Sequence, residues 1–264
     1  MKEIICIGNS SIDTIVFDKK RYKKKGGIHY ISKILSENKI KHRIIGVVGD
    51  DFNFKDSPYA DVSYLQRSKT TTSILIDKDK NDVKLFSYSG KINTNLPKDL
   101  LENSIVIIST IFEDISLNFV NKLKKDYNAK IFLDVQGFTR DYNDKGEILR
   151  KIFDPSLLKD IDVLKLNKSE FNLLFKDQEK MISEAIKLNI KIIILTLGKE
   201  GIKYYNNKKI VYLKTQPIET VENIGSGDRI LAGFFSKVYW GMDDLEAIKE
   251  SQKEVLENLK KNGK

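Results

Sequence analysis

The sequence predicts an α/β protein in which a mostly parallel sheet carries helices on both faces. Short apolar runs alternate along the chain with segments whose apolar residues recur at helical spacing, a pattern typical of parallel sheets. The 264 residues indicate one large domain, because domains usually contain about 100–200 residues. Hydrophobic residues make up 41% of the chain, which allows a sizeable core and excludes a disordered or collagen-like protein.

The first third of the chain supplies two predicted strands, one helix and a hairpin. Glu3–Gly8 and Arg43–Val48 are apolar runs that end in glycine and small polar residues. Between them, Gly27–Glu37 predicts a helix because its isoleucines and leucine share one face. Thr70–Asp77 and Val83–Ser89 alternate polar and apolar residues, as strands of a sheet with one wet face do. We expect this hairpin to project as a small second sheet.

The strand–helix alternation becomes regular after residue 100. The predicted strands are Ser104–Ser109, Lys130–Val135, Val163–Leu166, Lys191–Leu197, Ile202–Tyr205 and Ile210–Leu213. The predicted helices are Leu117–Tyr127, Glu170–Phe175, Gln178–Leu188, Asp228–Tyr239 and Leu245–Lys260. The chain shows neither internal repeats nor a long Pro/Gly/Ser linker, so we expect a single domain over residues 1–264.

The charge balance is basic, with 46 Lys and Arg against 37 Asp and Glu, a net charge of +9. Lysine is spread along the whole chain, which indicates a solvated surface and not a nucleic-acid partner. A positive field also suits an anionic small substrate. The apolar runs are too short for a signal peptide or a membrane span, and the single Cys excludes an internal disulfide. We therefore expect a cytoplasmic protein without a membrane partner.

Gly225-Ser226-Gly227-Asp228 carries the strongest indication of chemistry. Glycines allow successive backbone N–H groups to turn inward, and the N-terminus of the helix that follows adds partial positive charge. Such a cradle suits a phosphoryl group. Asp228 stands at its edge, where a carboxylate can accept the proton of a substrate hydroxyl. The alternative is that Asp228 only caps a helix after a glycine-rich loop.

Two other strand ends carry candidate nucleotide-side residues. Thr196–Gly201 contains two glycines three residues apart, which would let a backbone lie close to a nucleotide; the alternative is an ordinary turn. Asn167 and Glu170 follow a strand and present an amide and a carboxylate on one side. This pair could hold a hydrated Mg²⁺, or it could simply form a capping box.

Near the N-terminus, Asp13 follows the first strand, and Gly26-Gly27 precedes the first helix. A carboxylate accepts hydrogen bonds from vicinal hydroxyls, and the glycine pair allows a polyol to approach the backbone. The alternative is that Asp13 is a solvated loop acid.

These motifs, taken in order, resemble the PfkB-type carbohydrate kinases, also called the ribokinase family. Gly26-Gly27 with Ile45–Asp51 resembles the N-terminal signature of the family, and Glu222–Phe234 resembles its C-terminal signature, D-T-x-G-A-G-D-x-F-x-x-G. Asn167–Glu170 matches N-x-x-E, and Thr196–Gly201 matches T-x-G-x-x-G. The resemblance covers nearly the whole chain.

The resemblance implies a three-layer ribokinase-like sandwich with a small β lid from about 12–25 and 70–89. It also implies ATP as donor, Mg²⁺ as cofactor, Asp228 as catalytic base, and Gly225, Ser226 and Gly227 as anion hole. Asn167, Glu170, Thr196, Gly198 and Gly201 carry over to the cofactor side, with Glu170 reaching the metal through water. Asp13, Gly27 and Asp51 carry over to the phosphate acceptor.

A finer resemblance points to a branch that includes inositol kinases and related archaeal sugar kinases. Gly27–Ser32, Ile107–Ile115 and Leu133–Arg140 carry it. It adds His29, Gln136 and Arg140 to the substrate-binding candidates. Arg140 could pair with a phosphate or an acidic substrate group, or it could form a structural ion pair.

The chain also departs from the family pattern. Ile28, His29 and Tyr30 stand where the family has small residues and Asn, which disfavours a ribose-type pocket. Glu222-Asn223 replaces Asp-Thr, so the resemblance leaves monovalent-cation dependence open. Arg229 replaces a small residue beside Asp228 and could supply charge or point away.

The predicted function is transfer of the ATP γ-phosphoryl group to a hydroxyl of a small sugar, an inositol-like polyol or a nucleoside. The alternative is a catalytically silent sugar- or nucleotide-binding protein on the same fold. The resemblance further implies a homodimer formed through the lid.

Overall fold

A ten-stranded sheet forms the centre of the computed structural model, which describes residues 2–206, 209–215 and 225–262. The strand order is β16-β15-β14-β13-β10-β9-β1-β4-β5, and β6 also pairs with β4. The bounds are β1 Ile4–Ile7, β4 His42–Val48, β5 Ala60–Asp61, β6 Leu65–Arg67, β9 Ile105–Ser109, β10 Lys130–Asp134, β13 Val163–Asn167, β14 Ile192–Thr196, β15 Gly201–Asn206 and β16 Lys209–Lys214.

The strands from β14 to β5 run parallel, and the β15–β16 hairpin closes one edge antiparallel. Parallel strands are covered on both faces, so they are rich in Ile, Leu and Val on both sides. All four residues of β1, for example, are buried. The carboxyl ends of the parallel strands lie at one edge of the sheet, where ligands bind in open α/β folds.

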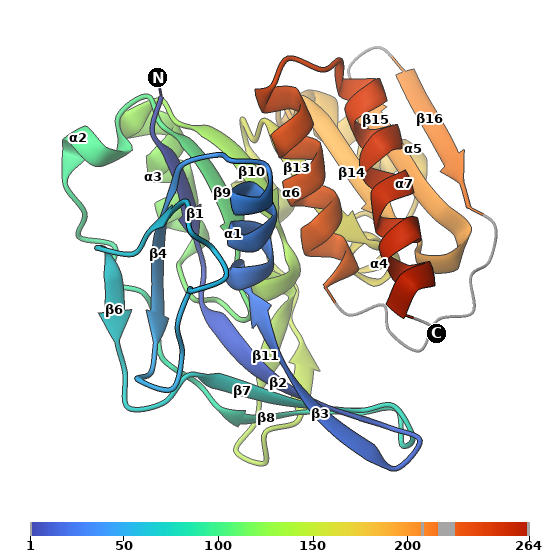
Figure 1. The fold of residues 1–264 in the computed structure, drawn as a ribbon. Helices are drawn as coiled ribbons and strands as arrows, with labels where there is room; N and C mark the ends of the chain where they lie inside the picture. The colour runs from blue at the N-terminus through green and yellow to red at the C-terminus, as the bar shows by residue number, and fades with distance from the viewer. Residues whose placement is uncertain (1, 207–208, 216–224, 263–264) are drawn as a thin grey trace.

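Helices cover both faces of this sheet (Figure 1). One face carries α1 (Ile28–Glu37), α6 (Ser226–Tyr239) and α7 (Asp244–Asn262), whose buried residues join a core with Ile44, Ile107 and Ile194. The other face carries α2 (Lys98–Leu101), α3 (Leu117–Tyr127), α4 (Lys168–Leu174) and α5 (Gln178–Lys187), which pack around residues such as Val106 and Leu164. The three layers confirm the predicted α/β class. None of the helices in the described ranges has both the length and the hydrophobicity to span a bilayer.

A second sheet projects from the edge that carries the carboxyl ends of the strands (Figure 1). Its order is β3-β2-β7-β8, with β2 Ser10–Phe17, β3 Lys20–Gly27, β7 Thr72–Asp77 and β8 Asp82–Ser87. The hairpin expected at 70–89 thus supplies two strands, and the chain around Asp13 supplies the others. We call these four strands the lid.

A short hairpin, β11 (Arg140–Tyr142) and β12 (Ile148–Arg150), lies beside the lid where the sequence indicated no element. It follows the 3₁₀ turn η1 (Gln136–Thr139) after β10, and η2 (Pro155–Leu158) leads on toward β13. A third turn, η3 (Gly198–Glu200), joins β14 to β15. These short elements lack a long periodic pattern, so apolar spacing does not reveal them.

Candidate active site

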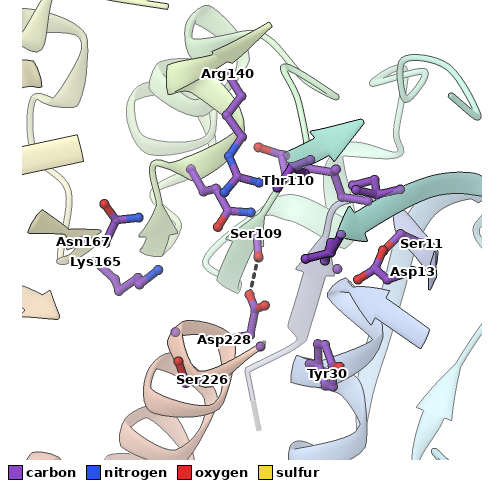
Figure 2. Close-up of a pocket in the computed structure, with 18 of the residues that line it drawn as sticks. Ser11, Asp13, Tyr30, Ser109, Thr110, Arg140, Lys165, Asn167, Ser226 and Asp228 are labelled. Carbon is purple, nitrogen blue, oxygen red and sulfur yellow. Dashed lines mark hydrogen bonds between the residues drawn. The ribbon is translucent and has the colours of Figure 1, made fainter. Parts of the chain in front are cut away.

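A cavity of about 300 Å³ lies between the lid, the carboxyl ends of the central strands and the N-terminus of α6. Figure 2 shows side chains from all three parts turned toward it. The lining residues are Ser11, Asp13, Gly27, Tyr30, Ile74, Ile76, Val83, Ser109, Thr110, Ile111, Gln136, Arg140, Lys165, Asn167, Thr196, Gly225, Ser226, Gly227 and Asp228. Segments far apart in the sequence therefore meet at one place.

The first turn of α6 opens directly onto this cavity. Gly225 caps the helix with φ 75°, a left-handed conformation that glycine adopts without strain. The helix begins at Ser226, two residues earlier than the apolar pattern indicated, so Asp228 lies in its first turn. The first N–H groups of a helix have no partner within the helix and carry the positive end of its dipole. This turn can therefore hold an anion.

Asp228 lies at the inner edge of that turn. Its Oδ1 accepts a hydrogen bond of 2.7 Å from the Ser109 hydroxyl at the end of β9 (Figure 2). Burial, and then the charge of Asp134, raise the pKa of Asp228 to about 6, while Lys165, Ser109 and Arg140 act in the opposite direction. A carboxyl group with this pKa can accept a proton near neutral pH.

Lys165 is a cation at the floor of the cavity that sequence reasoning missed. It lies in β13, is 3% exposed, and donates a 2.7 Å hydrogen bond from Nζ to Oδ2 of Asp134. Burial alone would lower its pKa, but the carboxylates of Asp134, Glu170 and Asp228 outweigh burial and raise the pKa of Lys165. The side chain is therefore charged throughout the physiological range.

The two glycines of the α6 turn are required by close neighbours. A Cβ atom at Gly227 would lie 2.5 Å from Nζ of Lys165, and one at Gly225 would lie 2.6 Å from Cε2 of Tyr30. The glycines thus allow the backbone of the turn to approach both side chains. The guanidinium carbon of Arg229 lies 5.7 Å from the ring centroid of Tyr30, so this arginine stacks on the ring and does not line the cavity.

Asp13 faces the turn from the lid side of the cavity. It belongs to β2 and is 6% exposed, and within the described ranges its Oδ1 has no hydrogen-bond partner. Burial raises its pKa to about 6, opposed by a hydrogen bond from Ser11 and by the charge of Arg140. Gly26 approaches so closely that a Cβ there would lie 2.5 Å from Asp13 Oδ2. A buried, unpartnered carboxylate oxygen is suited to accept a ligand hydroxyl.

Gln136 and Arg140 line the wall between the two carboxylates. The backbone N–H of Gln136 donates to Asp134 Oδ1 at 3.0 Å, which fixes the turn after β10. Burial lowers the pKa of Arg140, and the carboxylates of Glu170, Asp134, Asp228 and Asp13 oppose that shift. Arg140 thus lies within the electrostatic range of carboxylates on both sides of the cavity.

Asn167 and Glu170 form the capping box of α4. Both Glu170 carboxylate oxygens accept 2.7 Å hydrogen bonds from Asn167, and Asn167 Oδ1 accepts from the N–H groups of Ser169 and Glu170. Asn167 lines the cavity, whereas Glu170 is 4% exposed behind it. The described residues contain no cluster of three or more potential metal-ligating side chains. Because both Glu170 oxygens already accept hydrogen bonds from Asn167, this pair could contact a cation such as Mg²⁺ through bound waters.

Only part of the T-x-G-x-x-G segment reaches the cavity. Thr196 ends β14 and lines the cavity, whereas Gly198 and Gly201 do not line it. A Cβ at Gly201 would lie 2.1 Å from the carbonyl oxygen of Leu213, so this glycine is required for packing on β16. A Cβ at Gly198 would meet no atom within 4 Å. The assignment of both glycines to the nucleotide stays a prediction.

His29 and Asp51 lie outside the cavity. His29 is 3% exposed, packs between Phe52 and Phe54, and places Nε2 3.0 Å from Asp56. Asp51 Oδ1 accepts hydrogen bonds from the N–H and hydroxyl of Thr71, directly before β7. The geometry gives both residues contacts within the protein that stabilise the surroundings of the lid.

Sequence reasoning missed four polar residues that line the cavity: Ser11, Ser109, Thr110 and Lys165. Lys165 could have been found, because a lysine inside an apolar parallel strand must meet a buried partner. Ser109 and Thr110 could also have been found, because they lie at the carboxyl end of β9, the same kind of position that the other candidates occupy. Glu222 and Asn223, where the chain departs from the family signature, lie outside the described residues.

The fold and the cavity are those expected of an α/β phosphotransferase: a helix N-terminus that can hold an anion, a carboxylate beside it and a lid above. The family model described as "pfkB family carbohydrate kinase" matches residues 1–253. The chain belongs to this family, whose members transfer a phosphoryl group to a hydroxyl group, and the prediction from the sequence motifs is confirmed.

Individual relatives agree with this assignment. The chain is 26% identical over 272 aligned residues to an ATP-dependent 6-phosphofructokinase of Thermoanaerobacterium thermosaccharolyticum, covering 90% of this chain and 82% of that one. Among solved structures, a pyrophosphate-dependent kinase of the ribokinase family has a TM-score of 0.79 at 20% identity, over 97% and 94% of the two chains. Ribokinase of Arabidopsis thaliana has a TM-score of 0.73 at 17% identity, over 96% and 91%.

Proposed function

We propose that this protein transfers the γ-phosphoryl group of ATP to a hydroxyl of a small sugar, an inositol-like polyol or a nucleoside. One observation carries the proposal. The Asp228 carboxylate, with its pKa raised to about 6, lies in the first turn of a helix that opens onto the same cavity as the buried Asp13. A base, an anion cradle and a hydroxyl-binding carboxylate thus line one cavity.

In this proposal Asp13 orients the acceptor. Its unpartnered Oδ1 accepts a hydrogen bond from one hydroxyl of the acceptor, and Gly27 lines the cavity beside it. Ile74, Ile76 and Val83 of the lid line the same cavity with aliphatic side chains. These side chains exclude water, which would otherwise compete with the acceptor for the phosphoryl group.

Asp228 removes the proton of the reacting hydroxyl as the oxygen attacks the γ-phosphorus. The bond from that phosphorus to the bridging oxygen breaks, and the nucleoside diphosphate leaves with the electron pair. The N–H groups of Gly225, Ser226 and Gly227 stabilise the charge that develops on the transferring group. Lys165, held by Asp134 beside Gly227, adds a fixed positive charge at the same place.

The donor side is formed by Asn167, Glu170 and Thr196, with Gly198 and Gly201 in the turn that follows. The Asn167–Glu170 pair would hold Mg²⁺ through its waters, and the ion supplies charge neutralisation to the phosphates when bound. Lys165 and the helix N-terminus contribute positive charge from the protein itself. We propose no role for a monovalent cation.

A direct assay tests the proposal. Purified protein is incubated with Mg²⁺ and ATP, and fructose 6-phosphate, fructose, ribose, myo-inositol and adenosine are offered separately as acceptors. We expect acceptor-dependent ADP formation with at least one of them. Absence of turnover over the panel, together with calorimetric binding of a sugar or of ATP, would favour the alternative of a silent binding protein.

The same assay with pyrophosphate in place of ATP decides the donor. One kinase of similar fold is pyrophosphate-dependent, and a helix N-terminus can bind a terminal phosphoryl group whatever is attached to it. Turnover with ATP and not with pyrophosphate supports the proposal as stated.

A homodimer through the lid stays a prediction, and sedimentation of the purified protein tests it.

A further inference from the structure

The β11–β12 hairpin contacts three parts of the active site at once. Its first residue, Arg140, lines the cavity. Its tip contacts the outer edge of the lid, and its last residue, Arg150, donates a hydrogen bond to Ser169 in the first turn of α4. Figure 1 shows the hairpin beside the lid, whose edge strand β8 it contacts.

The contact at the tip is a backbone hydrogen bond to an edge strand. The Leu85 N–H of β8 donates to the Gly146 carbonyl at 2.8 Å, and Lys84 and Glu147 form an antiparallel bridge. Gly146 has φ 75°, and a Cβ there would lie 2.2 Å from the Leu85 carbonyl oxygen. Only glycine fits at this position with the lid where it is.

Side chains reinforce the contact below the tip. The Tyr142 ring lies 5.0 Å from Phe112 and 5.8 Å from Tyr88, centroid to centroid. Ile148 packs on a small core that joins the lid residues Ile74 and Leu85 to Ile111 and Phe112 of the loop after β9. Two of these residues, Ile74 and Ile111, also line the cavity. The hairpin is thus packed directly behind the cavity wall.

We infer that the β11–β12 hairpin is a positioning element that couples the lid to the donor side of the cavity. Through Gly146 it fixes the height of the lid over the acceptor, and through Arg150 and Ser169 it fixes the lid relative to the turn of Asn167 and Glu170. Arg140, at the root of the hairpin, then occupies the same place whenever the lid is docked. This inference rests on the proposed kinase function, since the coupling concerns acceptor and donor.

Gly146→Ala tests the inference, with Gly241→Ala as the matched control. Both glycines have positive φ, but a Cβ at Gly241, between α6 and α7, would meet no atom within 4 Å. Alanine therefore strains the backbone in both variants, but only in Gly146→Ala does the new Cβ clash with the lid. We expect Gly146→Ala to raise the KM for the acceptor about 10- to 100-fold, as a misplaced binding element does, and to leave the KM for ATP unchanged. The rate of ATP hydrolysis without acceptor should rise relative to transfer.

Two further measurements separate the possible failures. Hydrogen exchange of the Leu85 amide, measured without substrates, should accelerate in Gly146→Ala and not in Gly241→Ala. Arg150→Ala, which cuts the contact to Ser169, should alter the KM for ATP, and in a double-mutant cycle with Gly146→Ala the two effects on kcat/KM should not be additive. If Leu85 exchanges faster while the acceptor KM and the hydrolysis ratio stay at wild-type values, the inference is wrong. If the wild-type protein itself transfers no phosphoryl group, the proposed function fails instead, and only the exchange result stands.

Discussion

Gly227→Ala adds one methyl group at the most crowded point of the proposed anion cradle. The new Cβ would lie 2.5 Å from Nζ and 3.0 Å from Cε of Lys165. Since unstrained contacts between such atoms are about 3.5–4.0 Å, the ammonium group must move by about 1 Å. Lys165 is 3% exposed and bound to Asp134 at 2.7 Å, so this movement strains a buried ion pair.

The size of the effect follows from this displacement. Overpacking of this kind costs about 1–3 kcal/mol of folding free energy, which lowers the Tm of a domain of this size by about 2–12 °C. A displacement of about 1 Å at a reacting group reduces kcat by about 100-fold. Steady-state ADP release at saturating substrates and thermal melting by circular dichroism measure the two quantities.

Gly233→Ala is the control for this variant. It lies in the same helix, and its Cβ would lie 3.2 Å from the Ser251 hydroxyl oxygen, away from the cavity. We expect it to retain wild-type turnover. Wild-type kcat and Tm in Gly227→Ala would contradict this prediction, because Lys165 would then have room that the structure does not provide.

Three other predictions concern the charged groups of the cavity. Lys165→Met should lower the free energy of unfolding by about 3–5 kcal/mol, because it leaves the buried Asp134 without its ion-pair partner, and urea unfolding measures the loss; an unchanged midpoint contradicts it. Asp13→Asn should raise the KM for the acceptor and not that for ATP, since the carboxylate lies on the lid side; equal changes in initial-rate kinetics would count against this role. The log of kcat/KM should fall as pH decreases through about 6, because Asp228 and Asp13, whose pKa values are raised to about 6, act as anions. Because both carboxylates become protonated in this range, the plot of log kcat/KM against pH should be steeper than the plot for a single titrating group. A flat plot from pH 5 to 8 would contradict both roles.

The regular part of the fold could be predicted from the sequence, because each of its elements carries a clear hydrophobic period. Strands such as Lys130–Asp134 and helices such as Leu117–Tyr127 fall close to the predicted bounds. The lid strand β3 (Lys20–Gly27) could not be found in this way. It is rich in lysine, and Gly26 is the one residue of this strand that is buried, so its residues show no apolar alternation. Its register follows from pairing with β2.

Part of the site could likewise be predicted, since glycines and acids at strand ends stand out. Asp13, Asn167 and Asp228 all line the cavity. Lys165 did not stand out, because a single lysine in a short apolar run could equally be a solvent-exposed residue of a strand at the edge of the sheet. His29 packs against Phe52 and Phe54, which come from a loop distant in sequence from its helix. The residue pattern of the helix alone therefore could not predict that His29 faces away from the cavity.

In the proposed reaction Asp228 takes the proton of the acceptor hydroxyl, and the decisive experiment is single-turnover phosphoryl transfer by Asp228→Asn. The amide keeps the shape of the side chain, so the fold and the binding of ATP should be preserved. At saturating ATP and acceptor, rapid-quench measurement should give a transfer rate about 10²–10⁴-fold below that of the wild-type protein, a loss of about 2.7–5.4 kcal/mol of transition-state stabilisation. A transfer rate equal to that of the wild-type protein would contradict the assignment of Asp228 as the base.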